Sequence, residues 1–133
     1  MADYEIATML MFTGQAEEAI GLYTSLFEGS SVEVIARYGP EHPGGPEGQV
    51  VHARFRLNGK LVLAMDSAVP QTFTFTPSTS FFVTCPSAEE VDRLYAALSE
   101  GGSVMMALDS YPFAKRYAWV QDRFGVSWQL DFA

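Results

Sequence analysis

The sequence predicts an α+β protein made of two tandem βαβββ modules that together form a curved, eight-stranded open sheet. Three observations support this fold class: an internal repeat 72 positions apart, an Asn58-Gly59 hairpin signal, and strand-like alternation of apolar residues around that signal. A chain of 133 residues has the length of one domain. We expect a first module at about residues 4–66, a linker at 67–79 and a second module at about 80–133.

The internal repeat indicates that the two modules arose by duplication. Residues 16–29 and 88–101 align without a gap, and eight of the fourteen pairs are identical. In both copies apolar residues recur at three- and four-residue spacing, which is typical of an amphipathic helix. Ser87 followed by Glu90 indicates a capping box at the start of the second helix, and a glycine ends each segment. Each module therefore contains one helix.

One strand precedes each predicted helix and three strands follow it. The predicted strands are residues 5–12, 32–38, 49–57 and 60–66 in the first module, and 80–85, 103–108, 115–121 and 126–132 in the second. Asn58-Gly59 joins the last two strands of the first module, and the four-residue turn Asp122-Arg123-Phe124-Gly125 joins those of the second. Such a module is a small sheet with a helix on one face, and its other face stays uncovered.

Pairing across Asn58-Gly59 predicts which side chains share the uncovered face of the first module. His52, Arg54 and Arg56 lie opposite Met65, Leu63 and Leu61. The alternating residues on the other face are apolar enough to lie under a helix; they are Val51, Ala53, Phe55, Leu57, Val62 and Ala64.

The same argument assigns faces in the second module. A four-residue turn places Arg116, Ala118, Val120, Ser127, Gln129 and Asp131 on the uncovered face, with Tyr117, Trp119, Trp128 and Leu130 under the helix. In this register Arg116 and Asp131 face each other as a structural ion pair. Phe12 and Phe82 are predicted to point inward from the first strand of each module, with Leu10, Leu63 and Met65 nearby.

Charge and composition disfavour several classes of partner. The chain has 8 Lys and Arg against 16 Asp and Glu, a net charge of -8, so we expect neither nucleic acid nor a membrane surface as a partner. Its single cysteine, Cys85, cannot form an internal disulfide. The acidic start has no export signal, and no apolar run approaches the ~20 residues of a membrane span. A cytoplasmic location is the expectation.

Four stretches of the sequence resemble a known family. They are residues 12–19 leading into 23–27, His52-Ala53-Arg54-Phe55, residues 73–76 leading into Ser80-Phe81, and residues 119–129. The chain resembles the vicinal oxygen chelate superfamily, which includes glyoxalase I, bleomycin-resistance proteins and extradiol dioxygenases. Within it the PhnB-like branch, also called 3-demethylubiquinone 3-methyltransferase-like, is most similar. The resemblance implies tandem βαβββ modules and a homodimer.

The resemblance also defines where a metal or cofactor is expected. Metal-using members place ligands on the first and last strands of each module, at positions that correspond here to Thr8, Leu63, Ser80 and Gln129. Leucine cannot ligate and hydroxyls are poor ligands, so we predict no metal site. No glycine-rich strand-to-helix loop with a following acidic residue is present, so the methyltransferase name gains no support and no cofactor is predicted.

The candidate ligand-binding residues combine a few polar side chains with several apolar ones. They are His52, Arg54, Arg56, Phe12, Leu63, Met65, Phe82 and Gln129. The arginines can bind a carboxylate or phosphate, or equally pair with acids of a partner subunit. His52 is a weak candidate for a general base, with a partly buried structural histidine as the alternative. The apolar residues can line a pocket or pack against a second subunit.

Three functions follow from these residues. The favoured one is metal-free binding of a small organic ligand in the concave cleft of a homodimer. The alternative is a glyoxalase-type lyase, isomerase or dioxygenase-like enzyme that uses His52 or a non-standard metal set. The second alternative is a structural or regulatory dimer. The sequence does not distinguish enzyme from binding protein, because a shared fold is weak evidence for shared chemistry.

Overall fold

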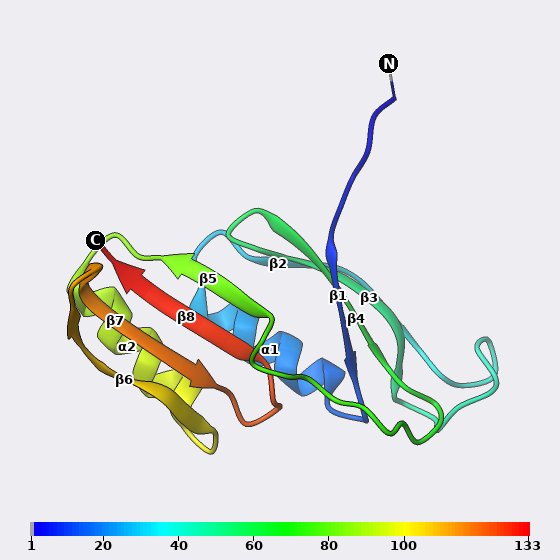
Figure 1. The fold of residues 1–133 in the computed structure, drawn as a ribbon. Helices are drawn as coiled ribbons and strands as arrows, with labels where there is room; N and C mark the ends of the chain where they lie inside the picture. The colour runs from blue at the N-terminus through cyan, green and yellow to red at the C-terminus, as the bar shows by residue number, and fades with distance from the viewer. Residues whose placement is uncertain (1) are drawn as a thin grey trace. The chain divides into compact units, whose positions relative to one another are not determined.

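The computed structural model describes residues 2–133, and the chain divides between Thr72 and Phe73 into two compact units (Figure 1). The first unit contains β1 (Thr8–Phe12), α1 (Ala16–Leu26), β2 (Ser31–Arg37), β3 (Val50–Leu57) and β4 (Lys60–Asp66). The second contains β5 (Ser80–Thr84), α2 (Ala88–Ser99), β6 (Ser103–Tyr111), β7 (Ala114–Gln121) and β8 (Ser127–Phe132). Neither of these helices is long and apolar enough to cross a membrane.

Each unit has one helix and one four-stranded mixed sheet, which confirms the α+β class and the repeated βαβββ order. The strand orders are β1-β4-β3-β2 and β5-β8-β7-β6. In both sheets the first strand pairs in parallel with the last, and the remaining pairs are antiparallel. The two sheets therefore repeat one topology, as the duplicated helix sequence predicted.

The helix of the first unit contacts β3 and β4. Its buried residues recur at helical spacing: Ala16, Ala19, Ile20 and Tyr23. On the strands, five of the six residues predicted to lie under a helix are buried, namely Ala53, Phe55, Leu57, Val62 and Ala64, whereas Val51 is half-buried. Arg56 pairs with Leu61 and Arg54 with Leu63 in the register, as the Asn58-Gly59 turn predicted. The alternation of the first hairpin is therefore confirmed.

The two helices begin in different ways. Ser87 caps α2, since its Oγ accepts the Glu90 N–H at 3.2 Å, while the Glu90 carboxylate pairs with Arg93. Only the serine half of the predicted capping box is thus seen. The cap position of α1 makes no side-chain hydrogen bond. Instead buried Asp66 accepts the N–H groups of Gly14 and Ala16 at 2.8 and 3.0 Å, and that of Val50 at 2.9 Å.

The predicted register of the second hairpin is wrong. Gln121 pairs with Ser127, so the turn contains five residues, 122–126, and not four. The Asp122 carboxylate holds the turn by accepting the N–H groups of Phe124 and Val126 and the indole N–H of Trp128, at 2.9, 3.0 and 2.9 Å. Because side chains alternate along a strand, one additional residue moves all of β7 to the opposite face.

This shift corrects the assignments on β7. Ala118 and Val120 are fully buried on the side that α2 covers, and Tyr117 and Trp119 pair with Asp131 and Gln129 on the other side. Arg116 does not face Asp131: its Nε donates to Asp92 of α2 at 2.8 Å. The expected Arg116–Asp131 ion pair is therefore wrong.

The predicted inward position of Phe12 is also wrong. In the parallel pair of β1 and β4, Leu10 aligns with Ala64 and Phe12 with Asp66, which places both on the helix-covered side. Phe12 is only 2% exposed and belongs to the core. The uncovered positions of β1 are Met9 and Met11, which align with Leu63 and Met65.

Candidate functional site

The helix of each unit leaves one face of its sheet uncovered, and we call these the first and second open faces. The first open face carries Met9, Met11, His52, Arg54, Arg56, Leu63 and Met65. Their neighbours along each strand, such as Phe55 and Val62, are fully buried on the opposite side. Five of the eight predicted ligand-binding residues therefore share this face.

An apolar stripe runs along β1 and β4 on the first open face. Met9 aligns with Leu63, and Met11 with Met65. Met9 is 46% exposed, and the other three side chains are half-buried. Methionine has an unbranched, polarizable side chain that adapts to irregular partners. The stripe thus offers an adaptable apolar surface on two paired strands.

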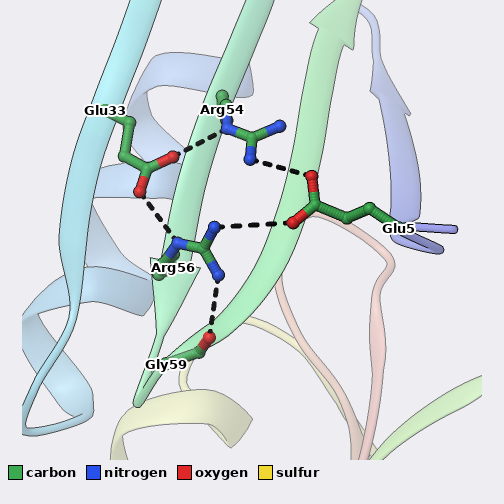
Figure 2. Close-up of polar contacts among 5 residues, drawn as sticks. All are labelled: Glu5, Glu33, Arg54, Arg56 and Gly59. Atoms are coloured by element: carbon green, nitrogen blue, oxygen red, sulfur yellow. Dashed lines mark hydrogen bonds and ion pairs between the residues drawn. The ribbon is translucent and has the colours of Figure 1, made fainter. Parts of the chain in front are cut away.

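Two arginines lie beside this stripe, and both are held by Glu33 (Figure 2). The Glu33 carboxylate accepts the Nε–H of Arg54 at 2.7 Å and that of Arg56 at 2.8 Å. Glu33 occupies a β-bulge in β2, between Val32, which aligns with Phe55, and Val34, which aligns with Arg54. An extra residue in a strand re-aims a side chain, and here the bulge brings Glu33 to both arginines.

Glu5 closes the other side of the arginine pair (Figure 2). Its Oε1 accepts the Nη2–H of Arg54 at 3.0 Å, and its Oε2 lies 3.7 Å from Nη2 of Arg56. Glu5 precedes β1 in a segment that belongs to no helix or strand. Arg56 also donates through Nη1 to the carbonyl oxygen of Gly59 at 3.2 Å. We call Glu5, Glu33, Arg54 and Arg56 the arginine cluster.

The hydrogen bonds of the arginine cluster stabilise its charged forms. Those from Arg56 and Arg54 lower the pKa of Glu33 below its ordinary value. Those to Glu5 and Glu33 raise the pKa of Arg54. With two guanidinium groups and two carboxylates, the formal charges of the cluster cancel.

The second open face has a different chemistry, built from aromatic rings, neutral polar groups and the carboxylate of Asp131. Tyr117 donates its hydroxyl to Oε1 of Gln129 at 2.6 Å, and Trp119 donates its indole N–H to Ser127 Oγ at 2.8 Å. Burial raises the pKa of the Tyr117 hydroxyl, which therefore stays protonated as a donor. Phe82 aligns with Gln129 and is 59% exposed. The predicted pair Phe82 and Gln129 thus lies on this face.

Four residues of the site were missed by sequence reasoning. Met9 and Met11 were missed because the register of β1 was assumed to follow that of the second module. Glu33 was missed because period-two alternation has no place for a bulge. Glu5 was missed because its acidic side chain was interpreted only as evidence against an export signal. The positions of both carboxylates depend on tertiary contacts that a sequence pattern does not encode.

The positions that correspond to metal ligands in the superfamily do not form a donor set. Thr8 aligns with Val62 on the helix-covered side, and Leu63 has no donor atom. Ser80 and Ser127 share a hydrogen bond of 2.6 Å, and the Gln129 oxygen accepts from Tyr117. Throughout residues 2–133, no group of three or more His, Cys, Asp or Glu is placed to hold a metal ion. The residues present do not fit the superfamily's metal.

Two further reactive side chains were singled out in the sequence. His52 is exposed near the start of β3 and aligns with Ala36 of β2. Cys85 is buried at the end of β5, and burial raises the pKa of its thiol. A raised pKa lowers the thiolate fraction, so Cys85 behaves as a small apolar residue.

Comparison with known proteins identifies what the chain is similar to. A family model described as 3-demethylubiquinone-9 3-methyltransferase matches residues 4–131. A Bacillus cereus PhnB protein that carries the same methyltransferase name is 48% identical; the match covers 98% of this chain and 100% of that one, with a TM-score of 0.93. Uncharacterized protein Mb0911c of Mycobacterium bovis is 29% identical over 125 residues, which cover 86% of this chain and 74% of the relative.

A more distant structure shows the fold alone. A glyoxalase/bleomycin resistance protein/dioxygenase from Nocardioides is 17% identical, and the match covers 99% of this chain and 85% of that chain, with a TM-score of 0.54. The βαβββ modules are therefore those of the vicinal oxygen chelate fold.

The methyltransferase name of the matching model implies S-adenosylmethionine, and the structure allows a test of fit. The doubly wound sites that bind such cofactors use a parallel sheet and available N–H donors at a strand-to-helix turn. Here both sheets are mixed, and the amides of Gly14 and Ala16 at the β1–α1 turn already donate to Asp66. The residues present do not fit this type of cofactor site.

Proposed function

Since the chain belongs to the 3-demethylubiquinone-9 3-methyltransferase family, the PhnB-like branch of the vicinal oxygen chelate superfamily, we propose that it binds a small organic ligand on its first open face. Binding requires neither a metal nor S-adenosylmethionine. The observation that carries this proposal is the apolar stripe of Met9, Met11, Leu63 and Met65 beside Arg54 and Arg56. Small-molecule sites typically combine such apolar surface with a few oriented polar groups.

The second open face supports the same function with a different surface. Its polar groups are oriented by hydrogen bonds, because Tyr117 holds the oxygen of Gln129 and directs the amide N–H groups elsewhere. Exposed Phe82 adds ring surface next to Gln129. We propose that Phe82 and Gln129 contribute to ligand binding as well.

A neutral fluorescent probe tests ligand binding on the first open face. We expect N-phenyl-1-naphthylamine to bind saturably with enhanced fluorescence. Leu63→Asn should raise its Kd about ten-fold, because losing roughly half of a leucine contact costs about 1.4 kcal/mol. Met11→Gln should act in the same direction, and circular dichroism melts would verify that both variants fold.

The matched control is Val69→Asn, which makes a comparable change at an exposed position after β4. Its Kd should equal that of the wild type. Saturable binding that Leu63→Asn and Met11→Gln leave unchanged would place the ligand elsewhere, and no saturable binding would refute the proposed function.

The homodimer is also a proposal. One edge strand of each sheet, β2 in the first and β6 in the second, exposes apolar residues, namely Val32, Val34, Val104 and Met105. Exposed edge strands with apolar side chains pair readily with another chain, and most soluble oligomers are symmetric dimers of one chain. We expect twice the chain mass of 14.6 kDa by size exclusion with light scattering, whereas a single chain mass at high concentration would contradict it.

A further inference from the structure

Within the arginine cluster, Glu33 fixes the orientation of both guanidinium groups. Arg54 and Arg56 are two positions apart on β3, so both side chains leave the same face of the sheet. Glu33 accepts from the Nε of each, at 2.7 and 2.8 Å. These bonds turn the outer Nη atoms of both arginines away from Glu33 (Figure 2). One outer nitrogen of each arginine, Nη2, is thus placed to bind one more anion.

That anion is Glu5, and little else holds it in place. Its carboxylate spans Nη2 of Arg54 and Nη2 of Arg56, at 3.0 and 3.7 Å. Its neighbours Tyr4 and Ile6 are 85% and 91% exposed, so packing contributes little to the position of this segment. Exposed ion pairs between flexible side chains are weak. A carboxylate from outside can therefore compete with Glu5 for the same two nitrogens.

Charge and register determine what kind of molecule would compete well. Without Glu5, the two arginines and Glu33 carry one net positive charge, which one carboxylate neutralises. Arg54 aligns across the sheet with Leu63, and Leu63 with Met9. A carboxylate bound at the arginines thus has the apolar stripe directly beside it.

We propose that Arg54 and Arg56 bind the carboxylate of an apolar organic acid, whose hydrocarbon part lies on Met9, Met11, Leu63 and Met65, and that Glu5 occupies this site in the ligand-free protein. The assignment deepens the proposed function and rests on it. Glu33 acts as a positioning residue, because it orients both arginines without contacting the ligand. The Glu5 segment competes with the ligand and thereby lowers its affinity.

Isothermal titration calorimetry with 2-naphthoate and its neutral analogue 2-naphthalenemethanol tests this assignment. We expect Glu5→Gln to tighten 2-naphthoate binding about three-fold, as removal of a competing surface ion pair allows. Arg54→Gln and Arg56→Gln should each weaken it about ten-fold or more, since each removes a charge-assisted hydrogen bond. Binding of 2-naphthalenemethanol should change little in all three variants.

Matched controls separate a local effect from a change in net charge. Glu41→Gln removes an exposed carboxylate of the loop before β3, and Arg37→Gln removes an arginine that pairs with Glu17 instead. Both controls should bind 2-naphthoate as the wild type does.

The outcomes also distinguish this assignment from the proposed function. If both probes bind and no cluster variant changes the affinity for 2-naphthoate, the carboxylate site is refuted while ligand binding stands. An equal gain in Glu5→Gln and Glu41→Gln would refute the role of Glu5. If neither probe binds any variant, both proposals fail.

Discussion

Asp66→Ala is expected to lower the free energy of unfolding of the first unit by about 3 kcal/mol, because it leaves buried N–H donors unpaired. The Asp66 carboxylate is almost fully buried and accepts from Gly14 and Ala16 at the β1–α1 turn and from Val50 of β3. It replaces the missing cap of α1 and joins the start of that helix to the start of β3. Urea unfolding followed by far-UV circular dichroism measures the loss.

Hydrogen exchange shows whether the effect is local. The amides of Gly14, Ala16 and Val50 should exchange faster in Asp66→Ala, and Asp66→Asn should be intermediate because it keeps one acceptor oxygen. Asp109→Ala is the control, since the Asp109 carboxylate is exposed and accepts from the adjacent Ser110 N–H. Equal stability of Asp66→Ala and Asp109→Ala would contradict the role of Asp66 as a cap.

Gly102→Ala is expected to destabilise the second unit by about 3 kcal/mol, the upper range for forcing extra atoms into a packed site. A Cβ at Gly102 would lie 2.1 Å from the carbonyl oxygen of Gln121 and 2.9 Å from the carbonyl carbon of Asp122. Both are backbone atoms next to the turn that Asp122 holds, so the hairpin itself must move. Both tryptophans, Trp119 and Trp128, lie in this unit, and their fluorescence reports its unfolding in urea.

Gly21→Ala is the matched substitution with the opposite expected sign. Gly21 lies inside α1 with nothing within 4 Å of its added Cβ, so alanine should stabilise the first unit by about 1 kcal/mol through helix propensity. If Gly102→Ala also stabilised the protein, or unfolded as the wild type does, a side chain at position 102 would be tolerated beside the Gln121 carbonyl. That result would contradict the prediction.

Local signals were sufficient to predict the βαβββ order and the first hairpin. Asn58-Gly59 fixes a two-residue turn, and with it the register of β3 on β4. The second hairpin lacks such a signal. Asp122 and Gly125 suggested four residues, but the Asp122 carboxylate closes a turn of five by reaching Val126 and Trp128. The length of that turn is set by buried side-chain hydrogen bonds, which alternation does not reveal.

The sequence predicted the two arginines of the candidate site but not the two glutamates that bind them. Alternation places Arg54 and Arg56 on one face, and the structure agrees. Their partners come from a bulge at Glu33 and from Glu5, which lies 49 positions from Arg54 in the chain. Phe12 is predicted to lie in the site because it is taken as the equivalent of Phe82 in the other module. In the structure Phe12 aligns with Asp66 on the helix-covered side of its sheet, whereas Phe82 aligns with Gln129 on the open side. The two modules share one topology but differ in which residues of the first strand face the helix.

Methionine methyl NMR tests most directly whether the first open face binds an apolar acid. The chain has six methionines, and Met9, Met11 and Met65 lie on this face, whereas Met105 and Met106 lie on β6 of the second unit. With methyl-labelled methionine and saturating 2-naphthoate, ring-current shifts should appear at Met9, Met11 and Met65 and decrease strongly in Arg54→Gln at the same probe concentration. Shifts confined to Met105 and Met106, or none at all, would contradict this binding face.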